Sequence, residues 1–566
     1  MKSKEKQENG TYDLSTMEKS GQKYMVSTEE NSTKLLGNKK KLLVTLCILI
    51  TEMCERLTYY SISAGILLFC TSKLNYAETD ATTINQVFAG IAYIIPIAGG
   101  FIADTFAGRF KTIMFASMLY IIGTLLIPAS AVAYETWGWE PLKTDAKKGI
   151  FMTGLLLVAI GTGGIKANVG PFGAEQVESM GKDTVQVFFN WFYWVINVGA
   201  LIAFAGVSYI QQNISFAWGF FVPLVSMSLA LVIFVTARSK YVKTEPNGSV
   251  LTTTCSILGE GISRSPPESS QDNDVGSRKF LWRAKQSYGG SHEDHLVDGV
   301  VSVIRVTPFC LLVIMYWAIY SQMSNTFFAQ SERMDIRIGD DYLPAAALNV
   351  FNTICIIILI PIVDRLVYPA FEKMGRPLTY LKRIGIGMIL SVMAVVVAGI
   401  VEIYRKEDME NFHVQVLGDK MFNASSMSVF IQVPQFALIG ASEIFAAIST
   451  LEFAYNQAPV AMQGLLTGLF LASSGIGNWV STAILAIVKA ATVDYPWWCD
   501  DINTCHMEYL MFLLGGLMFL NFLVFCVVAK FFTYQDPATF EKAIETDVVK
   551  DGHINDQEGV VIVDKL

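Results

Sequence analysis

Residues 42–70 read LLVTLCILITEMCERLTYYSISAGILLFC, an apolar run that contains three charged side chains, Glu52, Glu55 and Arg56. A helix needs about 20 mainly apolar residues to cross a bilayer, and this run is long enough. Charged groups are costly inside lipid, so they face protein or a water-filled cavity. The run therefore predicts a membrane-spanning helix with a functional polar face.

That face can be placed by helical spacing, because positions i, i+3, i+4, i+7 and i+8 share one side of a helix. The polar stripe consists of Glu52, Glu55, Arg56, Tyr59 and Tyr60. Two carboxylates beside one guanidinium leave one acid in excess, as a proton-binding site requires. The alternative is a salt bridge that only locks helices together.

The composition of the whole chain agrees with a membrane protein. Of 566 residues, 52% are hydrophobic and 16% are charged, whereas soluble domains carry about 25% charged residues. No metal spacing, nucleotide-binding loop, nucleophile motif or nucleic-acid patch is recognisable, so we expect no enzyme, no nucleic-acid partner and no cofactor beyond a coupling ion.

Apolar runs of spanning length recur along the chain. The predicted spans cover residues 42–70, 84–104, 112–134, 149–168, 186–210, 215–237, 300–328, 343–363, 380–402, 427–454, 461–490 and 508–532. A polar, Ser/Gly-rich stretch separates the first six from the last six. Two six-helix bundles joined by a linker, with a midplane site between them, form the architecture of the major facilitator superfamily.

This architecture divides the chain into five parts. We expect an N-terminal tail over 1–41, one bundle over 42–238, a linker over 239–299, the second bundle over 300–532, and a tail over 533–566.

Basic residues fix the expected orientation. They cluster at one end of the predicted spans, at Lys39, Lys40, Lys41, Arg109, Lys111, Arg238, Lys240, Lys243, Lys373, Arg376, Lys382 and Arg383. The positive-inside rule assigns this end, the tails and the linker to the cytosol. The sequons at Asn213 and Asn423 and the pair Cys499 and Cys505 fall at the opposite end. We expect glycosylation and a disulfide there.

Two further charges lie inside predicted spans. Lys166 belongs to a glycine-rich segment of the fourth span, from which it can reach the acids of the first span. Glu443 is the one charged residue in Leu438–Phe445 of the tenth span. Basic groups in the first bundle and an acid in the second suit a zwitterionic ligand held between them.

At these residues a family resemblance becomes specific. The segments Glu52–Tyr60, Gly99–Thr112, Gly163–Gln176, Phe189–Leu201 and Glu443–Pro459 together resemble the proton-coupled oligopeptide transporter family. The likeness covers about residues 40–535. It implies the major facilitator fold and transport of peptides coupled to protons.

The resemblance also implies roles for individual residues. Arg56 would bind the substrate carboxylate and Glu443 its amino group. Glu52, Glu55 and Lys166 would couple transport to protons, together with Arg56 and Glu443. The expected pocket lining comprises Tyr59, Tyr60, Tyr93, Asn197 and Asn352, with Lys166 beside it. Asp104 and Arg109 would belong to the cytosolic gating loop.

Departures from the family pattern narrow the subfamily. Ser63 replaces a second arginine, Gln86 stands where the intestinal type has histidine, and Ser321 replaces an acid before Gln322. Spans nine and ten are joined by a short loop. This pattern is similar to the animal peptide/histidine transporters and implies an endosomal or lysosomal membrane, with the plasma membrane as the less favoured alternative. Because plant nitrate/peptide transporters share some departures, an anion substrate is the alternative.

A second class of function is a substrate-sensing scaffold that recruits cytosolic adaptor proteins through its tails. The C-terminal Asp564–Leu566 suggests it, because such an end can add to a sheet edge in a carboxylate-binding domain. Separately, Glu29–Leu36 resembles an acidic dileucine sorting signal.

Overall fold

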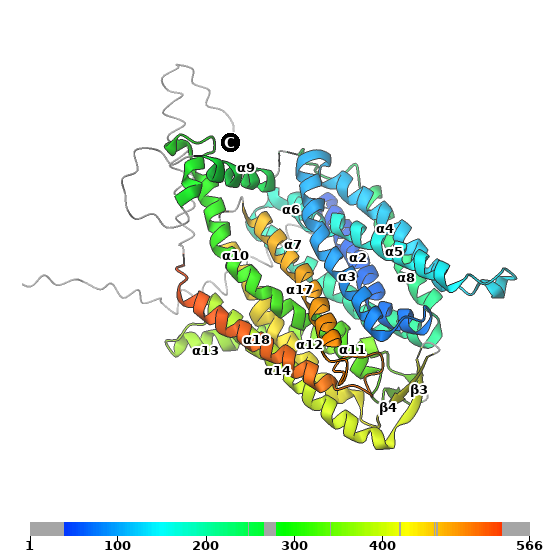
Figure 1. The fold of residues 1–566 in the computed structure, drawn as a ribbon. Helices are drawn as coiled ribbons and strands as arrows, with labels where there is room; N and C mark the ends of the chain where they lie inside the picture. The colour runs from blue at the N-terminus through cyan, green and yellow to red at the C-terminus, as the bar shows by residue number, and fades with distance from the viewer. Residues whose placement is uncertain are drawn as a thin grey trace, which may run out of the picture.

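The computed structural model describes residues 39–534, apart from 247, 249, 265–278, 340, 418–419, 458 and 460–461. Two groups of helices lie side by side, the first coloured blue to green and the second green to red (Figure 1). The dileucine-like segment and Asp564–Leu566 lie outside the described residues. The two-bundle helical architecture expected from the sequence is present.

In the described chain, the helices of the first bundle start with α2, which includes Lys39. This bundle comprises α2 (Lys39–Ser72), α3 (Glu78–Ile102), α4 (Arg109–Ala131), α5 (Thr144–Lys166), α6 (Val169–Val177), α7 (Lys182–Leu201) and α8 (Phe216–Thr236). Helix α3 is prolonged by a π-helical turn over Ala103–Ala107, and α7 continues in π-helical geometry over Ile202–Val207 and Ile210–Ile214.

The second bundle begins at Asp294 rather than at residue 300. Its helices are α10 (Asp294–Tyr320), α11 (Thr326–Ser331), α12 (Asn349–Ile362), α13 (Tyr368–Lys373), α14 (Tyr380–Glu407), α15 (Val433–Glu443), α16 (Ser449–Asn456), α17 (Gln463–Ala491) and α18 (Met507–Lys530). Helix α15 runs into α16 through a π-helical turn over Ile444–Ile448.

Eleven helical segments of the described chain are long and apolar enough to cross a bilayer. The 34-residue α2 is the twelfth spanning helix. Its mean hydropathy is lower than that of the other eleven because its middle carries Glu52, Glu55 and Arg56. Helices α3, α7 and α8 pack around it, and all three charged side chains are buried. The charges thus face protein, as the sequence predicts.

The linker is partly ordered. Helix α9 (Val250–Ser263) lies at one end of the molecule, next to the start of α10, and short 3₁₀ turns follow from Lys279. Hydrogen bonds from Ser291 and Arg264 hold the pKa of Glu260 below its usual range and tie α9 to the segment before α10. We refer to this end as the inner end.

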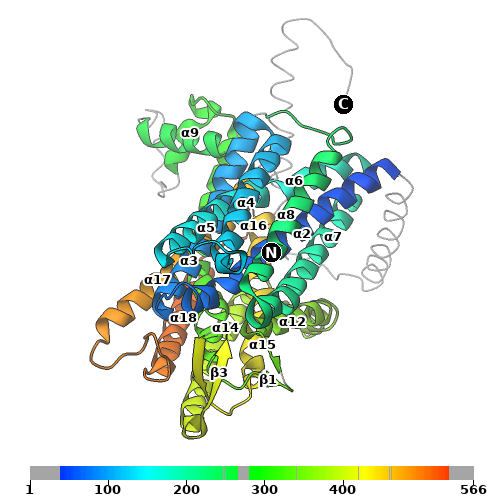
Figure 2. The ribbon, with the colours of Figure 1, turned by 90° about the vertical axis from the view of Figure 1, so that its right-hand side faces the viewer.

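The opposite, outer end carries two hairpins that the sequence did not predict. Strand β1 (Arg337–Ile338) pairs with β2 (Asp341–Tyr342), and β3 (His413–Leu417) pairs with β4 (Lys420–Ala424), both antiparallel. Figure 2 shows β1 and β3 at the end opposite α9.

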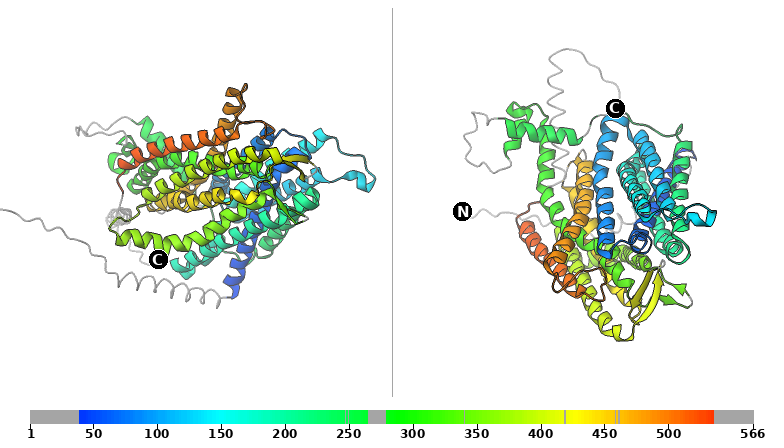
Figure 3. Two further views of the ribbon diagram at one scale, coloured as in Figure 1. Left: turned by 90° about the horizontal axis from the view of Figure 1, so that it is seen from below. Right: turned by 45° about the vertical axis from the view of Figure 1, so that its right-hand side comes forward.

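Glycine residues permit close contacts between helices at two crossings, one inside the first bundle and one between the bundles. A Cβ placed on Gly99 of α3 would lie 2.7 Å from the carbonyl oxygen of Gly163 on α5. Between the bundles, a Cβ on Gly475 of α17 would lie 2.8 Å from the carbonyl oxygen of Gly90 on α3. Helices α3 and α17 run side by side in both the first and third figures (Figure 3). Small residues at such crossings allow backbones to approach closely.

Candidate functional site

The polar stripe of α2 forms one buried ion network. Arg56 Nε lies 3.2 Å from Glu52 Oε1 and 2.5 Å from Glu55 Oε2. The other oxygen of Glu55 accepts a hydrogen bond of 2.6 Å from the Thr162 hydroxyl of α5. Glu52 Oε2 is buried and has no hydrogen-bond partner among the described residues. One guanidinium therefore pairs with two carboxylates, and the second oxygen of Glu52 has no hydrogen-bond partner among the described residues.

Lys166 approaches this network without bonding to it. Its Nζ lies 3.1 Å from the centre of the Tyr93 ring and 5.7 Å from that of Tyr59. Within the described chain this nitrogen has no hydrogen-bond partner. The sequence placed Lys166 within reach of Glu52 and Glu55; in this structure its ammonium contacts aromatic faces instead.

A cavity of about 190 Å³ lies between the two bundles. From the first bundle it is lined by Tyr59, Tyr60, Ser63, Asn85, Ala89, Tyr93, Tyr193, Ile196, Asn197, Ala200 and Phe204. From the second it is lined by Trp317, Tyr320, Ser321, Met323, Ser324, Asn325, Asn349, Asn352, Thr353, Ile356, Glu443, Ser474 and Asn478. Six of the eight expected ligand-binding residues line the cavity, namely Tyr59, Tyr60, Tyr93, Asn197, Asn352 and Glu443. Arg56 and Lys166 do not line it; Arg56 lies against the Tyr59 ring and Lys166 against the Tyr93 ring.

Glu443 is the acidic side chain of this cavity. Asn352 Nδ2 lies 3.5 Å from Glu443 Oε2, so α12 and α15 hold the carboxylate from adjacent positions. No Lys, Arg or His is found among the described residues that line the cavity. The acid therefore faces the cavity with the neutral Tyr320 hydroxyl and Asn352 amide beside it, and no cationic side chain of the described residues forms an ion pair with it.

The family model described as "POT family" matches residues 110–501, which is more than half of the sequence. The chain belongs to the POT family. It is therefore a multi-pass membrane transporter and not an enzyme.

Relatives in the POT family come from plants and animals. NRT1/PTR FAMILY 8.1 of Arabidopsis thaliana is 34% identical, with 86% of this chain and 93% of that protein covered. Solute carrier family 15 member 3 of Mus musculus is 29% identical over 87% of this chain and 92% of its own. Among solved structures, the POT family transporter PepTSo has a TM-score of 0.72 at 25% identity, covering 86% of this chain and 97% of that one.

The predicted gating loop lies at the inner end of the first bundle. Arg109 Nη2 lies 3.7 Å from Asp104 Oδ1, and Arg109 also forms a hydrogen-bonded ion pair with Glu175 of α6. Between the acid and the base, Gly108 adopts φ +76°, a conformation that favours glycine. Glu175 was not among the predicted residues, although it falls in a segment that resembles the family.

At the outer end the bundles are joined by polar contacts. Arg333, after α11, forms a 2.6 Å ion pair with Glu78 at the start of α3. Gln86 donates to Ser481 over 2.6 Å and accepts from Thr482 over 2.7 Å, so it joins α3 to α17. Gln86, which stands where the intestinal type has histidine, therefore helps to join the two bundles at this end.

The predicted sequons occupy different surroundings. Asn213 donates to the Tyr342 carbonyl oxygen over 2.7 Å and is part of the contact between bundles. Asn423 lies exposed on β4. Of the two, Asn423 has the more accessible side chain for a glycan.

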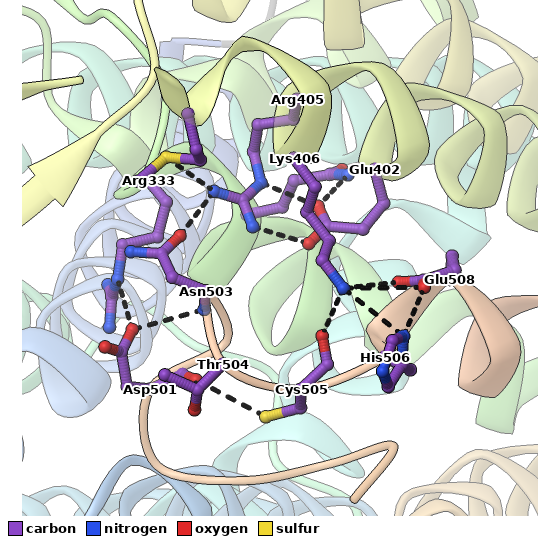
Figure 4. Close-up of polar contacts among 12 residues, drawn as sticks. Arg333, Glu402, Arg405, Lys406, Asp501, Asn503, Thr504, Cys505, His506 and Glu508 are labelled. Carbon is purple, nitrogen blue, oxygen red and sulfur yellow. Dashed lines mark hydrogen bonds and ion pairs between the residues drawn. The ribbon is translucent and has the colours of Figure 1, made fainter. Parts of the chain in front are cut away.

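Cys499 and Cys505 are joined by a disulfide that closes an outer loop. Arg405 holds this loop through a 2.6 Å bond to Asn503, and it also pairs with Glu402 over 2.6 Å (Figure 4). Lys406 donates to the Cys505 carbonyl oxygen over 2.6 Å. The same loop reaches the first bundle, because Asp500 Oδ1 accepts a 2.7 Å hydrogen bond from the Thr79 hydroxyl.

The sequence did not predict several uncharged residues that line the cavity from the second bundle. Trp317, Tyr320, Asn325, Asn349 and Asn478 line it. Single amides and aromatic residues are common in transmembrane helices, so hydropathy alone does not distinguish lining residues from packing residues.

Proposed function

We propose that this POT family member is a proton-coupled symporter that carries di- and tripeptides and free histidine across an endosomal or lysosomal membrane. The observation that carries the proposal is the unpaired Glu443 carboxylate on the cavity wall, opposite tyrosines that are backed by Arg56 and Lys166. A zwitterion has a cationic amino group for the acid and a carboxylate for the basic side.

The same observation favours an amino-group substrate over a nitrate-like anion. A small anion entering the cavity would meet a carboxylate, while Arg56 is already shared by two acids. Burying an anion next to a like charge is unfavourable. Because plant relatives carry NRT1/PTR names, a nitrate-like anion is included in the test as the competing substrate.

Proton coupling follows from the shared guanidinium. A proton on Glu52 or Glu55 would weaken that acid's attraction to Arg56, since a neutral carboxyl no longer forms an ion pair. Arg56 could then turn past Tyr59, whose ring centre lies 5.6 Å from the guanidinium carbon, to bind a substrate carboxylate. Lys166 would pair with the remaining anionic acid.

The proposed orientation places the inner end and both tails in the cytosol. Basic residues gather at the inner end, and the disulfide lies beside Asn423 at the outer end, where Asn503 Nδ2 donates to the Asn423 carbonyl oxygen over 3.0 Å. Such loops are typical of an oxidising lumen or exterior. Glycosidase treatment tests this orientation. It should lower the apparent mass of the wild type but not that of an Asn423→Gln variant.

The decisive test is uptake by purified protein in liposomes under an inward proton gradient. Labelled dipeptide, tripeptide, histidine and nitrate would be compared in parallel. We expect accumulation of the peptides and histidine above equilibrium, and none of nitrate. Nitrate uptake without peptide uptake would replace the proposal by the anion alternative. Binding of all substrates without any uptake would favour the sensing scaffold.

A further inference from the structure

A second cavity, of about 770 Å³, lies at the inner end of the first bundle, away from the transport site. It is enclosed by the α3–α4 turn, the end of α8 and the chain that follows α8. That chain is fastened to the bundle: Val242 N donates to Gln176 Oε1 over 2.7 Å, and Gln176 Nε2 donates back to the Val242 carbonyl oxygen over 3.0 Å. The chain segment that lines this side of the cavity is therefore held in place by hydrogen bonds to the first bundle.

Three basic side chains surround the opening. Lys111, Arg238 and Lys243 line the cavity and are exposed. Among the described residues, no carboxylate lies within ion-pair distance of any of the three, although Glu245 also lines the cavity. Arg109 lines it as well, but its charge is matched by Asp104 and Glu175. An excess of positive charge thus remains at the opening.

The floor of the cavity is aromatic. Phe110 and Phe172 line it, and Lys243 Nζ lies 4.3 Å from the centre of the Phe110 ring. Helix α4 begins at Arg109, and residues of its first turn line the cavity. The N–H groups of a helix's first turn have no partner within the helix and favour anions. Both features suit a ligand that carries phosphate.

Apolar side chains continue from the cavity along the bundle. On α4, Phe115 lines the cavity and is exposed, and Met118 and Ile122 follow it at helical spacing on the exposed surface. On α8, the exposed Val232 and Leu229 lead away in the same manner. Helices α4 and α8 pack against each other. A ligand with an anionic head and acyl chains would match the basic opening and these apolar faces together.

We propose that this cavity binds the headgroup of an anionic phospholipid of the cytosolic leaflet, with phosphate on Lys111, Arg238 and Lys243 and acyl chains against α4 and α8. The chain after α8 closes one wall of the cavity and leads into the linker between the bundles. A bound lipid would therefore stabilise the junction of the first bundle with the linker. The site is separate from the substrate cavity.

The test measures lipid binding to purified full-length protein in phosphatidylcholine nanodiscs with and without a phosphatidylinositol phosphate. We expect the lipid to raise the melting temperature of the wild type. The combined variant K111Q/R238Q/K243Q should bind it at least about tenfold more weakly, since each basic residue near an anionic lipid contributes about 1 kcal/mol. The matched control, K373Q/R376Q/K382Q, removes equal charge from the inner end of the second bundle and should bind like the wild type.

Three outcomes would overturn the proposal. Equal loss of binding in the control variant would show general attraction to the charged surface. Equally tight binding of soluble inositol trisphosphate would identify a free phosphate compound as the ligand. Tighter binding of a synthetic peptide with the acidic sequence of residues 533–566 would assign the cavity to the chain's own tail. Size-exclusion profiles and substrate-induced stabilisation would establish that every variant is folded.

Discussion

The ammonium of Lys166 lies 3.1 Å from the centre of the Tyr93 ring, although two carboxylates occupy the same buried region. Both carboxylates are engaged by Arg56, and Glu55 is further bonded to Thr162. Lys166 therefore stabilises its charge on an aromatic face, an interaction weaker than a buried ion pair. A cation held in this way can change partner when the charge on a nearby acid changes.

From this relationship we predict that Lys166→Ala uncouples transport. The variant should exchange labelled for unlabelled substrate across liposomes but lose accumulation under an inward proton gradient by about tenfold or more. Removal of the ammonium leaves Arg56 with two acids and no second cation for the one that is released.

The matched control is Lys148→Ala on the same helix, whose Nζ lies 4.3 Å from the centre of the Tyr76 ring outside the site. It should accumulate substrate like the wild type. If Lys166→Ala still concentrates substrate when the external pH is lowered, coupling depends on other groups, and Glu443 becomes the first to test.

Replacing Glu443 by Gln should abolish the preference for substrates with a free amino group. The amide keeps the size of the side chain and its contact with Asn352 but loses the negative charge. Hydrogen bonds to charged groups contribute about 1.5–3 kcal/mol. The ratio of affinities for a dipeptide and its N-acetylated form should therefore fall about tenfold to a hundredfold, measured by competition binding. An unchanged ratio would show that the amino group is bound elsewhere.

The sequence predicted the spans and the charged residues of the site because both depend on composition and spacing. Charges such as Glu52 and Glu443 are costly in lipid, so their presence in apolar runs marks function without knowledge of the fold. The partner of Lys166 could not be predicted in the same way. Whether its ammonium meets Glu52 or Tyr93 depends on helix rotation and on the close contact of Gly99 with Gly163.

The contacts that join the two bundles at the outer end could not be predicted from the sequence either. Gln86, Ser481 and Thr482 are uncharged and lie far apart in the chain, so no local pattern connects them. Hairpins β1–β2 and β3–β4 have short strands in loops, which carry little periodic signal.

We predict that Gln86→Ala favours opening of the outer end. The substitution removes the two hydrogen bonds of Gln86 to α17, each of which contributes about 1 kcal/mol. The open population should rise roughly thirtyfold if both contributions are lost, as measured by electron-electron resonance between spin labels at Ala146 and Val493 after the exposed Cys255 and Cys526 are replaced. In contrast, Thr83→Ala removes a bond within α3, to the Thr79 carbonyl oxygen, and should leave the distance distribution unchanged. Equal distributions for the two variants would contradict a sealing role for Gln86.

The disulfide between Cys499 and Cys505 should control how firmly the outer loop holds both bundles. Closing so short a loop stabilises a protein by about 2 kcal/mol when the link restricts the unfolded chain. Reduction should therefore lower the melting temperature by a few degrees, while the bonds of Arg405 to Asn503 and of Lys406 to Cys505 keep the loop on α14.

Asp500 is the part of the loop that reaches the first bundle, through the Thr79 hydroxyl. Without the disulfide this contact loses its rigid support, so reduction should also increase outer opening in the same spin-label measurement. A Cys499→Ser/Cys505→Ser variant should match the reduced wild type and should not respond to reductant. An Asp500→Asn variant with the disulfide intact should open the outer end without the same loss of melting temperature, because only the contact between bundles is weakened. If reduction lowers the melting temperature of the wild type, but the outer distances are the same in the reduced wild type and in both variants as in the oxidised wild type, the loop stabilises the second bundle alone and takes no part in closure.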